Sequence, residues 1–193
     1  MTLTDPMFAQ ILQFLIQTAF GLLIYLVLLR FWMQALRAPF RNPIGQFVVA
    51  LTDWAVLPLR RVIPSFRGYD LATLLLAWLL QLAMMVLLYA AAAGGKMNVP
   101  GGVVLLLSLL ELVRASLQLL IFVVIVQVVL SWVSPGHPLG YVFESLTRPF
   151  YGFFRRFVPP IGNIDLSPLF VIVIAQVLLI VLDGAPRAFL LGG

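Results

Sequence analysis

Two aspartates occupy matching positions in the chain, and each follows a pair of arginines at the same spacing. The first set is Arg60, Arg61, Pro64 and Asp70, and the second is Arg155, Arg156, Pro159 and Asp165. Each aspartate directly precedes a long apolar run. Its carboxylate could therefore cap a helix by accepting hydrogen bonds from the free amides of the first turn. A bound ion is the alternative ligand for this carboxylate.

The arginine pairs allow two interpretations as well. Arginines beside apolar runs anchor a membrane protein by binding lipid phosphates. Alternatively, one arginine of each pair binds the following aspartate and fixes the loop to the next helix, while the second arginine remains for lipid. The spacing is consistent with both interpretations.

Glutamines and one charged pair form a second candidate site within apolar stretches. Gln81 and Gln176 each follow their aspartate by eleven residues, which is about three helical turns and roughly 16 Å. Other polar residues recur at helical spacing in the remaining apolar runs: Gln10, Gln13, Gln17, Glu111, Arg114 and Gln118. We call these eight residues the polar seam. They could hydrogen-bond between packed helices, or they could line a path for an ion or substrate.

The elements that position these residues come from an internal repeat. At an offset of 95 residues, eleven identities link residues 43–81 to residues 138–176. The first copy contributes Pro43, Gly45, Leu51, Thr52, Arg60, Arg61, Pro64, Asp70, Leu71, Leu74 and Gln81. A repeat of this length determines the architecture. We therefore expect two repeats, over residues 1–95 and 96–193.

The composition indicates a membrane protein. The chain has 193 residues, of which 63% are hydrophobic and 10% are charged, against about 25% charged residues in soluble domains. The mean hydropathy is +1.10. Although the net charge is +5, the arginines cluster beside apolar runs, so nucleic acid is not the expected partner. Residues 1–29 contain no lysine or arginine, unlike the basic start of a secretory signal peptide.

Four stretches are long and apolar enough to span a bilayer: residues 6–29, 71–93, 103–133 and 166–182. The first ends at Arg30, Phe31 and Trp32, where we expect an aromatic and basic interface anchor. Two shorter segments, Ile44–Leu57 and Tyr141–Phe157, lie between the spans of each repeat. We expect each to be an interfacial or re-entrant helix.

The predicted fold class is an all-α polytopic membrane protein with four transmembrane helices in two parallel α-hairpin repeats. The loops after the first and third spans hold most of the arginine. They should therefore be cytoplasmic, with both termini outside. Two spans in each repeat give the two copies the same orientation.

Several motifs resemble those of the YggT family of small integral membrane proteins. They are the Asn-Pro-Ile-Gly of Asn42–Gly45, the Pro-Leu-Arg-Arg of Pro58–Arg61, the Ile-Pro of Ile63 and Pro64, and the Asp-Leu that begins at Asp70 and at Asp165. The second copy departs from them at His137–Gly140 and at Phe153 and Phe154. The resemblance covers both repeats and implies a bacterial plasma (inner) membrane protein. Members of this family are linked to osmotic stress and potassium homeostasis, to cell division and, in plastids, to cytochrome assembly and nucleoid distribution. The resemblance therefore implies these processes but does not name a reaction.

The sequence shows no pattern typical of an enzyme. There are no cysteines, His137 is the only histidine, and no metal-ligand spacing, phosphate loop or nucleophile motif occurs. We therefore expect no cofactor and no metal. The expected function is that of a membrane scaffold or assembly factor, whose arginine-rich face engages anionic lipid headgroups and an unidentified protein partner, with a homo-oligomer possible. The alternative is a small channel or transporter subunit that uses the polar seam.

Overall fold

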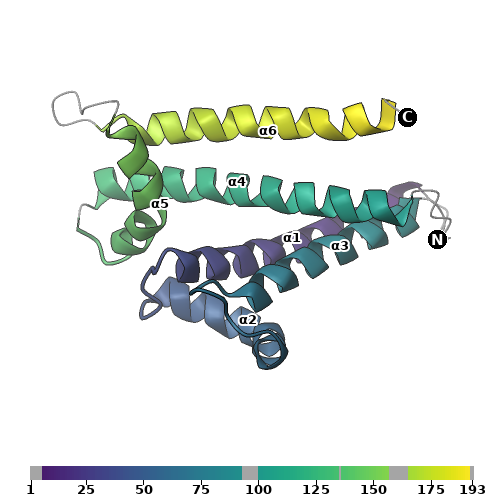
Figure 1. Ribbon diagram of the computed structural model, residues 1–193, viewed down its shortest axis with the longest axis horizontal. Helices are drawn as coiled ribbons and strands as arrows, with labels where there is room; N and C mark the ends of the chain where they lie inside the picture. Colours follow the sequence, from purple (N-terminus) through teal and green to yellow (C-terminus); the bar gives the residue numbers. More distant parts are fainter. Residues whose placement is uncertain (1–5, 93–99, 135, 157–164, 192–193) are drawn as a thin grey trace.

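The computed structural model describes residues 6–92, 100–134, 136–156 and 165–191 of the chain (Figure 1). Six helices make up most of these residues. In chain order they are α1 (Pro6–Ala35), α2 (Pro43–Val62), α3 (Leu71–Ala92), α4 (Gly101–Val133), α5 (Gly140–Phe154) and α6 (Ser167–Leu191).

Helices α1, α3, α4 and α6 are long and apolar enough to cross a membrane, which confirms the predicted fold class with four spans. Two of them are longer than the sequence indicated. Helix α1 continues past residue 29 to Ala35, and α6 continues past residue 182 to Leu191. Charged residues suggested both earlier limits, but Arg30 is buried and paired in the structure, so it does not end its helix.

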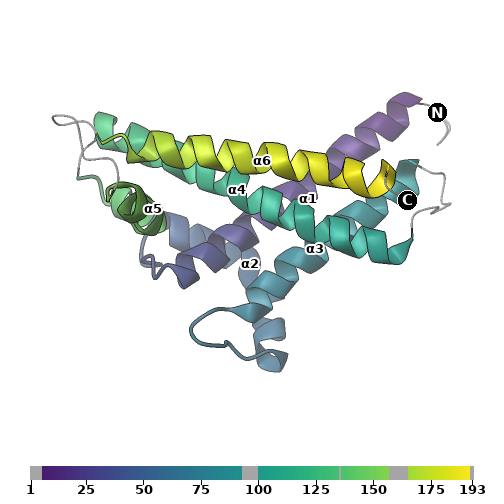
Figure 2. The same cartoon turned by 45° about the horizontal axis from the view of Figure 1, so that its top comes forward.

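The four long helices form two hairpins, α1 with α3 and α4 with α6 (Figures 1 and 2). The shorter helices α2 and α5 cross the ends of these hairpins on the same side of the molecule. We call this the arginine-rich end. The opposite end, where α1 begins and α6 finishes, is the terminal end. The two repeats therefore point in the same direction, as the even number of spans in each repeat predicted.

Local sequence explains where α2 begins. The side chain of Asn42 accepts a hydrogen bond from the Gly45 amide at 2.9 Å, and Pro43 occupies the first turn, where its missing N–H is harmless. A Cβ atom on Gly45 would lie 2.5 Å from the carbonyl oxygen of Phe40. Glycine is therefore required where the chain turns into α2. In the second copy, His137 stands in place of Asn42, and its Nδ1 accepts from the Leu139 amide at 3.2 Å.

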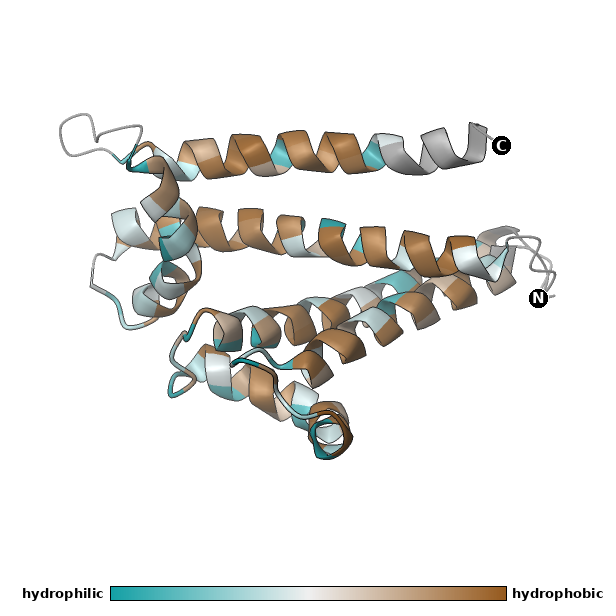
Figure 3. Cartoon of the chain, viewed as in Figure 1, coloured by the Kyte–Doolittle hydropathy of each residue, from teal (hydrophilic) through white to brown (hydrophobic). Residues whose placement is uncertain are grey.

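Helix α2 has one face buried in the protein and a second face that exposes apolar side chains. Val48, Thr52 and Val56 are buried against the hairpins. On the opposite face, Phe47, Leu51 and Trp54 are exposed, Trp54 to 68%. Figure 3 shows the long helices as mostly hydrophobic, with hydrophilic colours more frequent in the crossing helices and the connections.

The two repeats differ in how their last helices are packed. Helix α3 contacts α1, α2 and α4, whereas α6 contacts only α4 and α5. The largest buried cluster accordingly lies among α1, α3, α4 and the crossing helices. Helix α6 is an edge helix, and most of its hydrophobic side chains are exposed to the surroundings.

Candidate functional site

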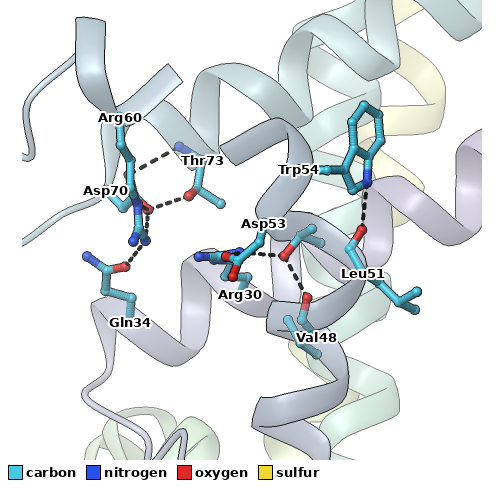
Figure 4. A network of polar contacts seen from close by, with 10 residues as sticks. Arg30, Gln34, Val48, Leu51, Asp53, Trp54, Arg60, Asp70 and Thr73 are labelled. Atoms are coloured by element: carbon cyan, nitrogen blue, oxygen red, sulfur yellow. Dashed lines mark hydrogen bonds and ion pairs between the residues drawn. The ribbon is translucent and has the colours of Figure 1, made fainter. Parts of the chain in front are cut away.

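The first arginine of each pair binds the following aspartate, and Figure 4 shows this contact for Arg60 and Asp70. Arg60 Nε donates to Asp70 Oδ2 at 2.9 Å, and Arg60 Nη2 donates to the same oxygen. Arg60 Nη2 also donates to Gln34 Oε1 at 2.7 Å. Arg60 therefore links α2, the end of α1 and the start of α3, around an aspartate that is only 2% exposed.

The same carboxylate also caps α3. The Thr73 amide donates to Asp70 Oδ1 at 3.2 Å, and the Thr73 hydroxyl donates to Oδ2. Helix capping, which was one of two interpretations for the aspartates, and arginine pairing, which was one of two interpretations for the arginines, thus occur together at Asp70. Pro64 is exposed in the loop between Arg60 and Asp70.

The second copy repeats the pair in a looser form. Arg155 donates from Nε and Nη2 to Asp165 Oδ2 at 3.0 and 2.6 Å, but its side chain is 58% exposed. Asp165 accepts from the Ser167 amide at 2.9 Å. Pro168 stands where Thr73 stands in the first copy and has no N–H to offer, which explains the changed cap. Pro159 lies outside the described residues.

Hydrogen bonds determine the ionisation of both aspartates. Burial raises the pKa of Asp70, but the hydrogen bonds from Arg60 and Thr73 and the Arg60 charge outweigh it, so this pKa lies below its ordinary value. For Asp165, burial likewise raises the pKa, while hydrogen bonds from Ser167 and Arg155 bring it below the ordinary value. Both side chains are therefore carboxylates at neutral pH.

A buried arginine forms a second polar cluster that sequence reasoning missed (Figure 4). Arg30 is 4% exposed, pairs with Asp53 of α2 at 2.7 Å and donates to the Thr52 hydroxyl at 2.7 Å. The expectation that Arg30 is a lipid-facing anchor is therefore wrong, because α2 covers it. A single acidic residue within an apolar segment was the available signal. Its partner lies in a different helix, however, which no local spacing reveals.

The second arginine of each pair is exposed. Within the described residues, neither Arg61 nor Arg156 makes a hydrogen bond or ion pair. They share the arginine-rich end with other arginines: Arg30, Arg37, Arg41, Arg60, Arg67, Arg148 and Arg155. Nine arginines against Asp53, Asp70, Glu144 and Asp165 leave a charge of +5 at this end, as large as that of the whole chain.

The polar seam lines a cavity in the other half of the molecule. The cavity has a volume of about 740 Å³ and lies between α1, α3 and α4. Six seam residues meet there: Gln13, Gln17, Gln81, Glu111, Arg114 and Gln118. Tyr25 also lines it and donates a hydrogen bond to Gln118 Oε1 at 2.6 Å. We call this space the polar cavity.

Two seam residues lie elsewhere. Gln10 is exposed near the start of α1, and Gln176 is exposed on α6. Gln176 therefore does not meet the other seam residues at the polar cavity. Although the two occupy equivalent repeat positions, α3 is packed on several sides while α6 is an edge helix.

The polar cavity does not continue to the arginine-rich end. Between the two lies a set of buried apolar residues that we call the apolar plug: Val27, Leu28, Leu76, Ala77, Leu119 and Val123. Gln81 lies next to the plug, ten residues from the start of α3 and eleven from its end. The cavity therefore reaches about the middle of α3 and stops there.

Comparison with known proteins gives a family and no activity. The sequence profile of the CCB3/YggT family matches residues 9–91 and again residues 106–185, one match for each repeat. A Vibrio alginolyticus protein, "Uncharacterized protein in proC 3'region", is 45% identical over 82% of this chain and 85% of its own. "Uncharacterized protein YggT" of Escherichia coli strain K12 is 35% identical over 86% of each chain. No solved structure matches the chain. These matches cover most of both repeats, and the chain belongs to the CCB3/YggT family.

Proposed function

We propose that this protein is a non-enzymatic membrane scaffold or assembly factor whose arginine-rich end engages anionic lipid headgroups and a protein partner. The observation that carries the proposal is the charge of +5 gathered at one end of four membrane-spanning helices. Basic side chains next to a membrane surface each contribute about 1 kcal/mol of attraction to anionic lipid.

The arginine pairs support this division of roles. In each copy the first arginine is held by an aspartate, while the second is exposed and unpaired within the described residues. A fully exposed guanidinium can bind a phosphate with two parallel hydrogen bonds. The same spacing in both repeats places one such arginine beside each crossing helix.

The outer face of α2 supports partner binding at the same end. Phe47, Leu51 and Trp54 recur at helical spacing and are exposed. Tryptophan is favoured at the membrane interface and is also common at binding hot spots. We propose that this face inserts at headgroup depth and contacts the transmembrane segment of a partner. A photo-crosslinking residue at position 54 should then capture a protein, whereas the same residue at 176 should capture lipid.

The proposed location is the bacterial inner membrane, with the arginine-rich end in the cytoplasm and both termini outside. The positive-inside rule and the position of both crossing helices at one end support this orientation. A tag after residue 193 should be labelled in intact cells by an impermeant reagent. Labelling only after permeabilisation would reverse the orientation.

Lipid binding is tested on the purified full chain by comparing thermal stability in phosphatidylglycerol and in phosphatidylcholine. Phosphatidylglycerol should raise the melting temperature of the native protein. The double variant Arg61→Gln/Arg156→Gln should lose this increase. The matched control, Arg60→Gln/Arg155→Gln, should be less stable in both lipids but keep the increase. If the first variant keeps it too, the exposed arginines do not bind headgroups.

A channel or transporter subunit, with the link to potassium or osmotic homeostasis that the resemblance implies, is the second candidate. The polar cavity favours it, because polar side chains reach about the middle of α3. The apolar plug opposes it, because buried apolar side chains lie between the cavity and the arginine-rich end. Solute flux in vesicles that contain the purified protein would establish this transport function. If no flux occurs, the scaffold function is favoured.

A further inference from the structure

Gln81 is a buried amide with no hydrogen-bond partner in the part of the chain that the structure describes. Its side chain is 4% exposed and lines the polar cavity. Among the described residues it makes no hydrogen bond, yet neither of its polar atoms is sealed from the cavity. An amide in an apolar environment without a hydrogen bond costs several kcal/mol relative to water. Its orientation therefore requires a hydrogen-bonding occupant of the cavity.

The shape of the cavity limits what that occupant is. The space is about 740 Å³, within the range of about 300–1,000 Å³ typical of small-molecule sites. It ends at the apolar plug and extends along Gln17 and Gln13 toward the terminal end. Gln13, Gln17 and Gln118 in its lining are exposed, so the space is open to the outside of the bundle, while the apolar plug closes it toward the arginine-rich end.

The lining favours a hydrophilic molecule with several hydrogen-bonding groups. Gln13, Gln17 and Gln118 add three amides to that of Gln81. Gln118 uses its oxygen to accept from Tyr25, which leaves its NH₂ group to donate. An amide both donates and accepts, so the lining can match hydroxyl, amide or ammonium groups.

The charges disfavour an anion. Glu111 accepts from Arg114 at 2.7 Å, and Asp183 of α6 accepts from the other side of the same guanidinium. Two carboxylates around one guanidinium leave a net charge of −1 beside the cavity. Glu111 and Arg114 line the cavity and balance each other, and Asp183, which is 62% exposed, adds a negative charge close by, so the site favours a cation over an anion.

We propose that the polar cavity is a water-filled binding site, reached from the terminal end and closed toward the arginine-rich end, for a small hydrophilic molecule without negative charge, with Gln81 at its base. This proposal does not depend on lipid binding at the arginine-rich end, and it is tested by a different measurement. The cavity would bind its ligand in either a scaffold or a transporter.

The chain contains no cysteine, so single-cysteine variants can test the cavity without background. Gln81→Cys and Gln17→Cys place a thiol in the cavity. Gln176→Cys is the matched control, because it occupies the equivalent repeat position but is exposed on α6. Methanethiosulfonate reagents label a thiolate by forming a mixed disulfide and releasing methanesulfinate. A cationic trimethylammonium reagent and an anionic sulfonate reagent are added separately to each face of sealed vesicles that contain the full chain.

Both cavity cysteines should react from the face of the terminal end and not from the other. They should react about tenfold faster than Gln176→Cys, because a thiol in lipid is neither ionised nor wetted. After correction for their intrinsic rates, the cationic reagent should label the cavity cysteines about tenfold faster than the anionic reagent. Glycerol or another small polyol should slow the labelling of Gln17→Cys, in which Gln81 is intact.

Three results would overturn the proposal. Equal labelling of the cavity cysteines and Gln176→Cys would mean that lipid fills the space. Labelling of Gln81→Cys from both faces would mean an open path rather than a closed site. Equal or faster reaction with the anionic reagent would remove the charge selectivity. If Gln81→Cys does not fold, Gln17→Cys and Gln118→Cys give the same comparisons.

Discussion

Arg60 and Asp70 are joined by two hydrogen bonds from one guanidinium to a single carboxylate oxygen, and the carboxylate is almost completely buried. Arg155 and Asp165 repeat this relationship 95 residues later, but at an exposed site. One sequence motif therefore occurs in two environments, which provides a comparison within a single protein.

The two pairs should differ in their contribution to stability. Arg60→Gln leaves Asp70 buried without its charge partner and should lower the free energy of unfolding by about 2 kcal/mol. Arg155→Gln breaks an exposed pair and should cost less than about 1 kcal/mol. Chemical unfolding in detergent measures both, with Arg61→Gln as the control that should change little. Equal losses for the two variants would show that burial does not decide the strength of the pair.

The lowered pKa of Asp70 makes part of the stability depend on pH. An aspartate with a lowered folded-state pKa stabilises the fold above its unfolded pKa, which is about 3.9, and loses that effect as the pH falls through the folded pKa. The stability difference between the native protein and Asp70→Asn should therefore be constant from pH 7 to 5. It should then shrink below about pH 4. A difference that does not change down to pH 2 would contradict the assigned cause.

Much of the arginine-rich end could be predicted from the sequence. The hydropathy predicts four spans. The spacing of Arg60 and Asp70 indicates that they lie close together, because a short loop joins the end of α2 to the start of α3. The Arg30–Asp53 pair could not be predicted in the same way. It depends on how far α2 folds back over α1, a packing property that local patterns do not determine.

The different positions of Gln81 and Gln176 were not predictable either. The repeat makes them equivalent in sequence, and the sequence pattern does not indicate which of the two hairpins is packed on more sides in the bundle. Helix α3 is covered by α1, α2 and α4, while α6 has neighbours only in α4 and α5. The environment of a repeated residue therefore depends on where its copy lies in the bundle.

Gly45 should tolerate no side chain, whereas Gly140, the residue at the same position in the second repeat, should tolerate one. Gly45→Ala places a Cβ atom 2.5 Å from the Phe40 carbonyl oxygen, so backbone must move. The expected loss is about 1–3 kcal/mol of unfolding free energy. Gly140→Ala meets nothing within 4 Å and should be neutral or slightly stabilising. Equal effects of the two substitutions would mean that the turn before α2 is not as tight as the structure indicates.

The buried Arg30 should depend on Asp53. Asp53→Asn leaves a guanidinium that is 4% exposed without its counter-charge and should cost about 3 kcal/mol. The double variant Arg30→Met/Asp53→Leu removes both charges and should recover most of this loss, since a well-packed apolar replacement of a buried pair is often neutral. Unfolding of the two variants measures the difference. A double variant as unstable as the single one would show that Arg30 stabilises the fold mainly through Thr52.

The last prediction separates the two glutamines. Gln176→Leu replaces an exposed polar group on an edge helix and should leave stability unchanged or raise it in a lipid environment, because the amide has no partner to lose among the described residues. Gln81→Leu removes the base of the polar cavity and places an apolar side chain beside the apolar plug. It should change the free energy of unfolding by less than about 1 kcal/mol, because Gln81 has no hydrogen bond to lose among the described residues, while it should abolish the protection of Gln17→Cys by polyols. A marked loss of stability for Gln176→Leu alone would show that another molecule covers α6. The oligomeric state, measured in the same detergent by light scattering, would then tell whether that molecule is a second copy of the chain.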